Sequence, residues 1–268
     1  MRQSQADIDN LDFEAFKRKV WAAYGIDLNA YKRQQMERRL RANMLRYGVS
    51  TFQQYYSVLQ SDNALLDEFL DRITINVSEL FRNPVQFETL NTNILPKLLA
   101  ETSHLFAWSA GCSCGAEAHT LAILLDELAS DRHHKVLATD IDDKMLARCA
   151  AGVYREHEMR GVSRQRIAKY FDKRPEGYVA KAVLRHQIMC KKHNLLEERF
   201  GHGFDLILCR NVVIYFTEET KTRLYARFLE ALRPGGYLFV GGTERISNCA
   251  DIGFENDAPF FYRRPCSS

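Results

Sequence analysis

The 268-residue sequence lacks the features that mark several classes of protein. No apolar run approaches the ~20 residues that a bilayer-spanning helix requires, and the N-terminal MRQSQADIDN contains no hydrophobic segment of a secretory signal. The seven cysteines are an odd number and, with the histidines, offer no set of four well-spaced zinc ligands. We therefore expect a cytoplasmic protein with reduced thiols, no metal site and no membrane insertion.

A strong excess of one charge is also absent. The net charge is +3, hydrophobic residues make up 46% and charged residues 26%, which is ordinary for a globular protein. The length is sufficient for one large or two small domains, each with a proper core.

The most informative stretch is LFAWSAGCSCGAEAHTLAILLDEL over residues 105–128. It begins as an apolar run, turns through small residues and ends in a helical pattern of leucines, so it predicts a strand, a tight loop and a helix. A second apolar run over residues 135–139 stops at Asp140. Gly111 and Gly115 allow close backbone approach, and a strand-end carboxylate can accept hydrogen bonds from ribose hydroxyls.

The loop lacks the glycine spacing of a dinucleotide site and the lysine of a P-loop. It is typical of a site for a nucleoside without a pyrophosphate, of which S-adenosylmethionine is the commonest. The same residues, Gly111 to Gly115, also spell G-x-S-x-G, the nucleophile elbow of α/β-hydrolases. No HGGG-type oxyanion motif precedes them, so the nucleoside site is favoured over a hydrolase or a purely structural turn.

The N-terminal part predicts helices only. Apolar stripes indicate helices over residues 11–24 and 28–47, a third from residue 52 capped by Ser50 or Thr51, and a fourth capped by Asp62 or Asn63. We divide the chain into a helical domain over 1–72, a polar linker over 73–85 and a third part over 86–268.

The second predicted helix is unusually basic. Between Tyr31 and Arg46 six basic residues stand against one acid, Glu37. One interpretation is a solvated helix face. The other is a docking surface for an acidic helix or for nucleic acid.

The third part alternates strands and helices, which predicts a parallel α/β sheet with helices on both faces. We expect helices over 143–151 and from Thr217, two short strands over 178–184 and 187–191, and strands over 204–209, 237–240 and 259–263. Asp140, Asn194 and Asn211 follow strands, so they are expected at one edge of the sheet, where such sheets bind ligands.

Six stretches are distinctive in their order and spacing: TINVSELFR (74–82), WSAGCSCGAEAHTLA (108–122), ATDID (138–142), KKHNLL (191–196), CRNVVIYF (209–216) and LFVGGTE (238–244). Together they resemble the CheR family of chemoreceptor glutamate methyltransferases. The resemblance covers nearly the whole chain. It implies a Rossmann-like class I methyltransferase sheet, a small all-α N-terminal domain and a short antiparallel β excursion.

The resemblance also implies the site. S-adenosylmethionine would be the methyl donor, S-adenosylhomocysteine the product, and glutamates of the chemoreceptor helical bundle the acceptors. By position, cofactor contacts fall on Asn76, Ser78, Arg82, Glu117, Asp140, Asn194, Leu195, Asn211 and Val212, and catalytic roles on Arg82 and Tyr215. The basic helix, with Arg38, Arg39 and Arg41, would dock the receptor.

The loop departs from the family pattern G-x-S-T-G-E-E-P-Y-S. Cys114, Ala116, Ala118, His119 and Thr120 replace the usual residues, whereas Glu117 is retained. We expect His119 to be a helix-surface or packing residue rather than a base. A nucleic-acid methyltransferase and a non-catalytic S-adenosylmethionine sensor remain as alternatives, although no RNA-binding motif is present and the expected protein is a monomer that binds no nucleic acid.

Overall fold

The computed structural model describes residues 5–61, 65, 68–69 and 78–266. These residues form two compact units, one over 1–76 with 215–221 and the other over 77–214 with 222–268. The N-terminal unit contains α1 (Gln5–Tyr24), a 3₁₀ turn (Leu28–Ala30), α2 (Arg33–Arg46) and α3 (Phe52–Ser61). Asn76, much of the linker and most of the predicted fourth helix lie outside the described residues.

The N-terminal unit is held together by an aromatic core. Phe16 packs against Phe52 and Tyr55, with ring centroids 5.3 and 5.7 Å apart. The Asp12 carboxylate on α1 accepts the first main-chain N–H groups of α3, including that of Phe52 at 2.6 Å. Thr51 adds its own cap, because its hydroxyl accepts the N–H of Gln54.

The prediction of one continuous helix over 28–47 is wrong. Tyr31 and Lys32 are extended, and their main chain pairs with a distant segment instead of continuing the helix. The Lys32 N–H donates to the Tyr215 carbonyl at 2.8 Å, and the Thr217 N–H donates to the Ala30 carbonyl at 2.9 Å. Residues 215–217 are therefore part of the N-terminal unit.

The larger unit is an α/β fold. Its strands are β1 (Phe106–Ala110), β2 (Lys135–Asp140), β3 (Val153–Tyr154), β4 (Phe171–Arg174), β5 (Gly177–Ala180), β6 (Ile188–Lys192), β7 (Phe204–Cys209), β8 (Leu232–Val240), β9 (Glu255–Ala258) and β10 (Phe261–Arg263). Its helices are α5 (Pro84–Thr89), α6 (Leu95–Glu101), α7 (Ala116–Ala129), α8 (Asp143–Ala151), α9 (Arg164–Tyr170), α10 (Ala182–Arg185), α11 (Glu218–Ala231) and α12 (Cys249–Ile252). Short π and 3₁₀ turns occupy Leu90–Ile94, Glu156–Met159 and Val213–Tyr215.

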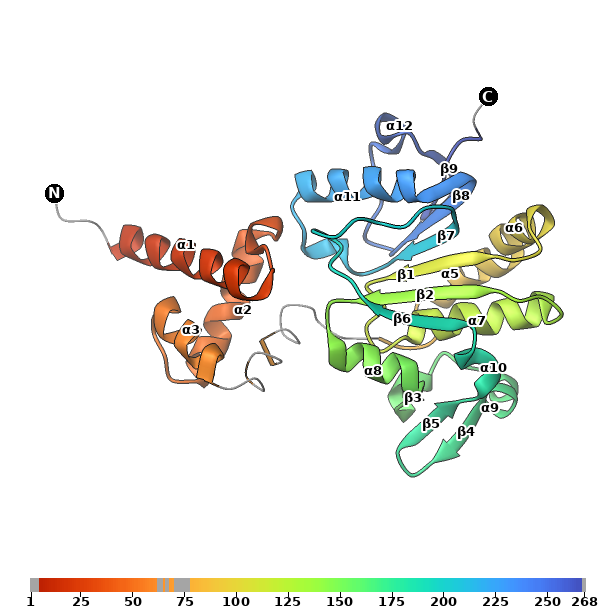
Figure 1. Ribbon diagram of the computed structural model, residues 1–268, viewed down its shortest axis with the longest axis horizontal. Helices are drawn as coiled ribbons and strands as arrows, with labels where there is room; N and C mark the ends of the chain where they lie inside the picture. The colour runs from red at the N-terminus through yellow and green to blue at the C-terminus, as the bar shows by residue number, and fades with distance from the viewer. Residues whose placement is uncertain (1–4, 62–64, 66–67, 70–77, 267–268) are drawn as a thin grey trace. The chain divides into compact units, whose positions relative to one another are not determined.

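Seven of the described strands form one sheet in the order β6-β2-β1-β7-β8-β10-β9 (Figure 1). The strands from β6 to β8 are parallel, whereas β10 and β9 are antiparallel, so the expectation of a wholly parallel sheet is corrected to a mixed one. The chain moves from β1 towards β6 and later from β7 towards β9. Right-handed crossovers then put α7 and α8 on one face and α11 on the other.

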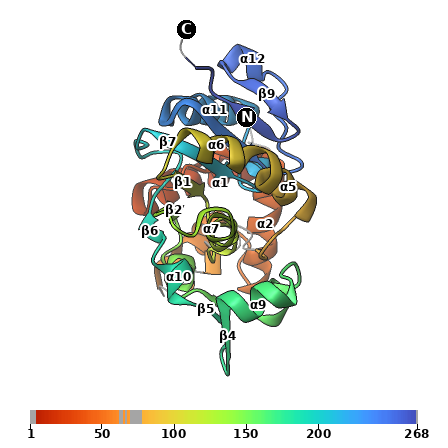
Figure 2. The same ribbon diagram turned by 90° about the vertical axis from the view of Figure 1, so that its right-hand side faces the viewer.

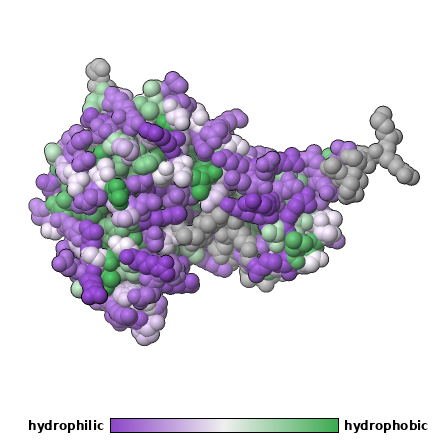
Figure 3. Space-filling model, turned by 180° about the vertical axis from the view of Figure 1, so that it is seen from behind, coloured by the Kyte–Doolittle hydropathy of each residue, from purple (hydrophilic) through white to green (hydrophobic). Residues whose placement is uncertain are grey.

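The order of the strands reverses between β1 and β7, and this is the point at which open α/β sheets bind ligands. The strands there are buried along their length, as β7 illustrates with every residue buried. Figure 2 looks along α7, with the small β4–β5 ribbon projecting below it. Figure 3 views the molecule from behind Figure 1, and hydrophobic residues form only small scattered patches on the face that it shows.

The small sheet β3-β5-β4 is the expected antiparallel excursion, with a two-residue turn at Pro175–Glu176. One detail of the prediction is wrong, because the strand expected over 178–184 ends at Ala180, and α10 follows it. The strand expected over 187–191 is present as β6 and pairs in parallel with β2 in the main sheet. The strand predicted over 259–263 begins only at Phe261, as β10, because Phe260 turns the chain with φ +72°. The strand β9 before that turn was not predicted.

Candidate functional site

A pocket lies at the carboxyl ends of β1 and β7, entirely within the larger unit. It is lined by Ser78, Glu79, Arg82, Phe87, Gly111, Cys112, Ala116, Glu117, Arg210 and Asn211. Acidic and basic side chains both face it, which suits a zwitterionic ligand such as an amino acid. No group of histidine, cysteine or acidic residues suited to a metal ion occurs in the described part of the chain.

The loop after β1 is shaped for close backbone approach. Gly111 and Gly115 have φ of +80° and +84°, and Ser113 also has a positive φ, +48°. A Cβ at Gly111 would lie 2.6 Å from a methyl carbon of Val212, so glycine alone fits without movement of that side chain. Non-glycine residues at positive φ also occur at Phe81, Asn83 and Asn211, all near this pocket. Such backbone strain clusters at functional sites.

Asp140 ends β2 and organises the loop. One carboxylate oxygen accepts the Ser113 N–H at 2.8 Å and the other accepts the Asp142 N–H at 3.1 Å. Burial raises the pKa of Asp140, and these N–H bonds oppose the rise. Each oxygen keeps a lone pair for a further donor, which suits the two ribose hydroxyls of a nucleoside.

Glu117 and Arg210 form a buried ion pair in the pocket. The Ser109 hydroxyl donates to Glu117 at 2.7 Å, and the Arg210 guanidinium lies 3.5 Å from its other oxygen. Burial raises the pKa of Glu117, and the charge of Arg210 opposes that rise. The Arg210 guanidinium lies 4.8 Å from the centre of the Phe87 ring and 4.6 Å from that of Phe239, and these two rings meet edge to face.

Arg210 also fixes the segment that carries Arg82. Its second terminal nitrogen donates to the Arg82 carbonyl at 2.9 Å, to the Asn83 side chain at 3.0 Å and to Gln86 at 2.9 Å. The sequence prediction did not assign a role to Arg210. Its position immediately after an apolar strand, beside Asn211, could have indicated that it lies at the ligand-binding edge of the sheet.

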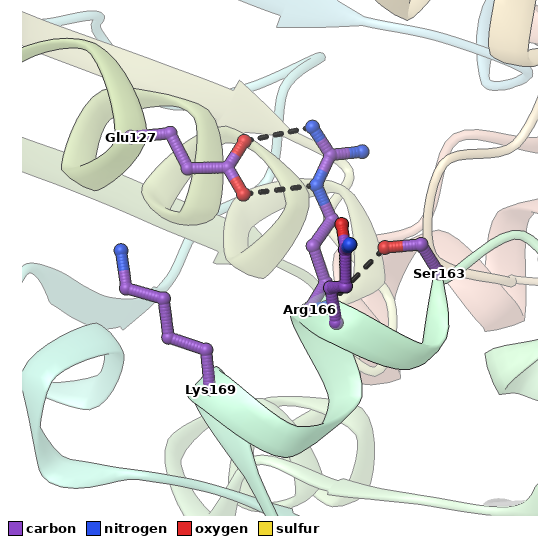
Figure 4. A pocket seen from close by; sticks show the side chains of 5 residues that line it. Glu127, Ser163, Arg166 and Lys169 are labelled. Carbon is purple, nitrogen blue, oxygen red and sulfur yellow. Dashed lines mark hydrogen bonds and ion pairs between the residues drawn. The ribbon is translucent and has the colours of Figure 1, made fainter.

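Residues 80–82 are held to the larger unit by three further contacts. The Leu80 N–H donates to the Glu158 carbonyl, and the Phe81 N–H donates to the Thr120 hydroxyl at 3.0 Å. Arg166 lies 4.3 Å from the centre of the Phe81 ring. Figure 4 shows why Arg166 is fixed, because it makes two bonds to Glu127, at 3.0 and 2.7 Å.

Glu244 holds the loop after β7 and was also missed. Its carboxylate accepts the N–H groups of Asn211 at 2.5 Å, Gly241 at 2.9 Å and Ile214 at 3.3 Å. These bonds stabilise Asn211 at its φ of +61°. Sequence reasoning included Glu244 in a motif but could not see that three N–H groups converge on it.

The segment after β6 lies beside Asp140. The His193 N–H donates to the Asp140 carbonyl at 2.9 Å. The Asn194 side chain accepts the Leu196 N–H at 3.0 Å, and the Leu195 carbonyl accepts a bond from Arg227 at 2.6 Å. These bonds place Asn194 and Leu195 at the same sheet edge as Asp140.

The structure thus brings together most of the predicted residues of the larger unit. Ser78, Arg82, Glu117 and Asn211 line the pocket, Val212 contacts its glycine loop, and Asp140, Asn194 and Leu195 lie at the adjacent strand ends. Asn76 lies outside the described residues.

His119 is a packing residue and not a helix-surface residue, the other alternative that the sequence left. It is fully buried, with Nδ1 2.7 Å from the Tyr154 hydroxyl and 3.0 Å from the Gly115 carbonyl. Burial lowers the pKa of His119 to about 4.

Tyr215 and the basic helix belong to the N-terminal unit. The Arg39 guanidinium lies 4.5 Å from the centre of the Tyr215 ring. Arg41 pairs with Glu37 at 2.8 Å and lies over Phe52, whereas Arg38 is exposed. The three arginines are therefore not equivalent.

Two family models match the chain in succession. The all-alpha domain of CheR methyltransferase matches residues 11–74, and the SAM binding domain of CheR methyltransferase matches residues 76–256. The chain belongs to the CheR methyltransferase family. It is an S-adenosylmethionine-dependent methyltransferase with the class I fold, and S-adenosylmethionine is its cofactor.

Curated relatives agree over nearly the full length. The chain is 40% identical to the chemotaxis protein methyltransferase of Listeria monocytogenes, over 94% of this chain and 96% of that protein. It is 39% identical to the Listeria innocua protein of the same name, with the same coverage. Chemotaxis protein methyltransferase 1 of Pseudomonas aeruginosa is 34% identical, over 90% of this chain and 93% of that protein. The hydrolase alternative is not supported. No helix in the described ranges is long and apolar enough to span a bilayer.

Proposed function

We propose that this methyltransferase transfers the methyl group of S-adenosylmethionine to glutamate side chains in the cytoplasmic helical bundle of chemoreceptors, forming glutamate methyl esters. The observation that carries the proposal is the pocket at the β1–β7 reversal, in which Glu117 and Arg82 face the same space beside the Asp140 strand end. The chemotaxis methyltransferases of Listeria and Pseudomonas support the choice of substrate. We also propose that the protein acts in the cytoplasm as a monomer.

Each predicted residue has a role in this proposal. Asp140 accepts hydrogen bonds from the ribose, and Glu117 binds the ammonium group of the methionine moiety. Asn194 and Leu195 line the adenine edge. Asn76, Ser78, Asn211 and Val212 complete the cofactor site, and Arg82 and Tyr215 align the acceptor carboxylate.

Bound S-adenosylmethionine supplies an electrophilic methyl group on a sulfonium. The acceptor glutamate, with a pKa of ~4.3, is ionised at neutral pH and needs no strong general base. The chain therefore contributes alignment and desolvation, with Arg82 and Tyr215 orienting the carboxylate for in-line attack. The buried Arg210 network supports this role because it fixes the Arg82 backbone.

We further propose that residues 1–72 form a receptor-docking domain, that 73–85 link it to the catalytic domain and contribute to the site, and that 86–268 bind the cofactor. Arg38, Arg39 and Arg41 on α2 would attract an acidic receptor helix. The turn of the β4–β5 ribbon is short, so we expect little dependence on a receptor tail as a tether.

The test is methyl transfer itself. The protein is incubated with labelled S-adenosylmethionine and receptor cytoplasmic fragments, with and without their C-terminal tails. The proposal predicts base-labile label on receptor glutamates, equally in both fragments. Base-stable label, label on nucleic acid instead, or cofactor binding without any transfer would contradict it.

A further inference from the structure

Four cysteines gather around the glycine loop of the cofactor site. Cys112 and Cys114 belong to the loop, Cys149 lies on α8 and Cys190 lies on β6, an outer strand of the main sheet. The sulfur atoms of Cys149 and Cys190 are 3.3 Å apart. Cys149 is fully buried, whereas Cys190 is partly exposed. The methyl-transfer reaction uses none of these thiols.

Cys149 supports the loop directly. A Cβ built on Gly115 would lie 2.3 Å from the Cys149 sulfur, so the Gly115 backbone rests against that atom. Gly115 has a φ of +84° and immediately precedes α7. Two residues earlier, the Ser113 N–H is bound to Asp140. A displacement of the Cys149 sulfur therefore acts on the loop that meets the ribose carboxylate.

We propose that Cys149 and Cys190 form an oxidation-sensitive pair whose disulfide weakens cofactor binding. The inference rests on the proposed role of this loop in holding the cofactor. A disulfide bond is ~2.05 Å long, so the two sulfurs approach each other by about 1.2 Å. Because the Gly115 backbone rests against the Cys149 sulfur, a displacement of that atom on bond formation changes the contact that supports the turn.

A hydrogen peroxide molecule is a sufficient oxidant. The partly exposed Cys190 sulfur attacks one peroxide oxygen, the O–O bond breaks, and a sulfenic acid and one water form. The Cys149 sulfur then attacks the sulfenic sulfur, forming the S–S bond and releasing a second water. The two sulfurs lose two electrons in total, the peroxide gains them, and both thiol protons end in water.

The environment makes this reaction slow at neutral pH. The hydrogen bond with Cys112 raises the pKa of Cys149, and the contact with Cys149 raises the pKa of Cys190. Because the thiolate is the nucleophile, the rate of oxidation should increase as the pH rises.

The full-length protein is treated with hydrogen peroxide, its remaining thiols are alkylated, and a digest is analysed by mass spectrometry. We expect a peptide pair linked through Cys149 and Cys190. Calorimetry with S-adenosylhomocysteine should show affinity about tenfold weaker, within the usual range for coupled sites, and restored by dithiothreitol. Cys190→Ser should keep its affinity after peroxide, whereas the exposed-site control Cys266→Ser should respond like the wild type.

Three results would overturn the inference: linkage of Cys112 to Cys149, oxidation of Cys190 to a sulfinic acid without linkage, or a linked protein with unchanged affinity. Failure of the reduced protein to bind S-adenosylhomocysteine would instead contradict the proposed cofactor site. The two failures are therefore distinguishable.

Discussion

The two units of the molecule use charge in opposite ways. At the strand ends of the larger unit, Asp140, Arg210 and Glu244 are buried and Glu117 is largely covered. Each of the four is bound by main-chain groups or by a charged partner. On α2, Arg38 is exposed and Arg41 is only partly covered. Buried charge is costly to desolvate and must be fixed in place, whereas exposed charge is screened and chiefly raises the rate of encounter.

The comparison teaches how one chain can separate two tasks. The buried network gives a rigid site whose geometry tolerates little change. The exposed arginines give a surface that attracts an acidic helix without a fixed geometry of its own. Changes in the first region should therefore be severe and independent of salt, and changes in the second moderate and dependent on salt.

The largest effect is expected from Arg210→Ala. The substitution leaves Glu117 as a buried, unpaired carboxylate and removes three bonds to the segment 82–86. Loss of one partner of a buried pair costs ~3–5 kcal/mol, and we expect a decrease of that size in the free energy of unfolding, measured by urea denaturation. A decrease below ~1 kcal/mol would show that the network does not stabilise the fold. Lys97→Ala, which breaks a more exposed pair with Asp257, is the control.

The next effect is a pH dependence due to His119. Burial lowers its pKa to about 4, below the ~6.5 of the unfolded chain, so the unfolded state binds more protons between these values. The stability that depends on neutral His119 is complete above pH ~6.5 and is lost as the pH falls towards 4, by about 3 kcal/mol. His119→Gln should lack this loss in denaturation series from pH 7 to 4. If the free energy of unfolding fell equally with pH in both proteins, His119 would not be the group responsible.

Asp140→Ala should abolish cofactor binding while leaving the fold intact. The variant loses the acceptor for two ribose hydroxyls, and hydrogen bonds to a charged group contribute ~1.5–3 kcal/mol each, so affinity should fall by roughly 100-fold or more. Calorimetric titration with S-adenosylmethionine measures the change, and circular dichroism checks the fold. Unchanged affinity would remove Asp140 from the site.

Arg82→Ala should act on turnover more than on cofactor binding. If Arg82 orients the acceptor carboxylate, kcat at saturating cofactor should fall about tenfold or more, with a smaller change in the Kd of S-adenosylmethionine. Arg82→Lys keeps the charge but loses the planar fork, and should recover only part of the rate. A kcat near that of the wild type would show that the assigned role is wrong.

The smallest effect is expected on α2. Charge reversal at Arg38, Arg39 and Arg41 should raise the KM for receptor fragments several-fold, leaving cofactor affinity unchanged. The single variants should differ from one another, because Arg38→Glu should raise KM without a change in kcat. Arg39→Glu should also lower kcat, since Arg39 lies over Tyr215. Reversal of the exposed Lys135, at the opposite ends of the strands, is the control.

The sequence was sufficient to predict the features that depend on local pattern. The strand–loop–helix around Gly111, the carboxylate of Asp140 at a strand end and the separate helical part all follow from apolar periodicity and turn residues. The strand over 204–209 was predicted with its observed bounds because a buried parallel strand is apolar throughout.

The features that were missed depend on contacts between distant segments. The break before α2 exists because residues 30–32 pair with 215–217, and no local pattern at Tyr31 indicates that pairing. Arg210 and Glu244 are buried charges whose partners lie about 30 to 130 positions away. The early end of β5 at Ala180 was also missed, because the short helix α10 that follows it has too few residues to show a helical periodicity.

The most direct test of the different roles of buried and exposed charge is the salt dependence of receptor and cofactor binding by the unaltered protein. The KM for a receptor fragment and the Kd for S-adenosylmethionine are measured from 0.05 to 1 M salt, a range over which the Debye length falls from more than 10 Å to ~3 Å. The account predicts a KM that rises steeply with salt and a Kd that changes little. A flat KM, or a Kd that rises in parallel with it, would contradict the account.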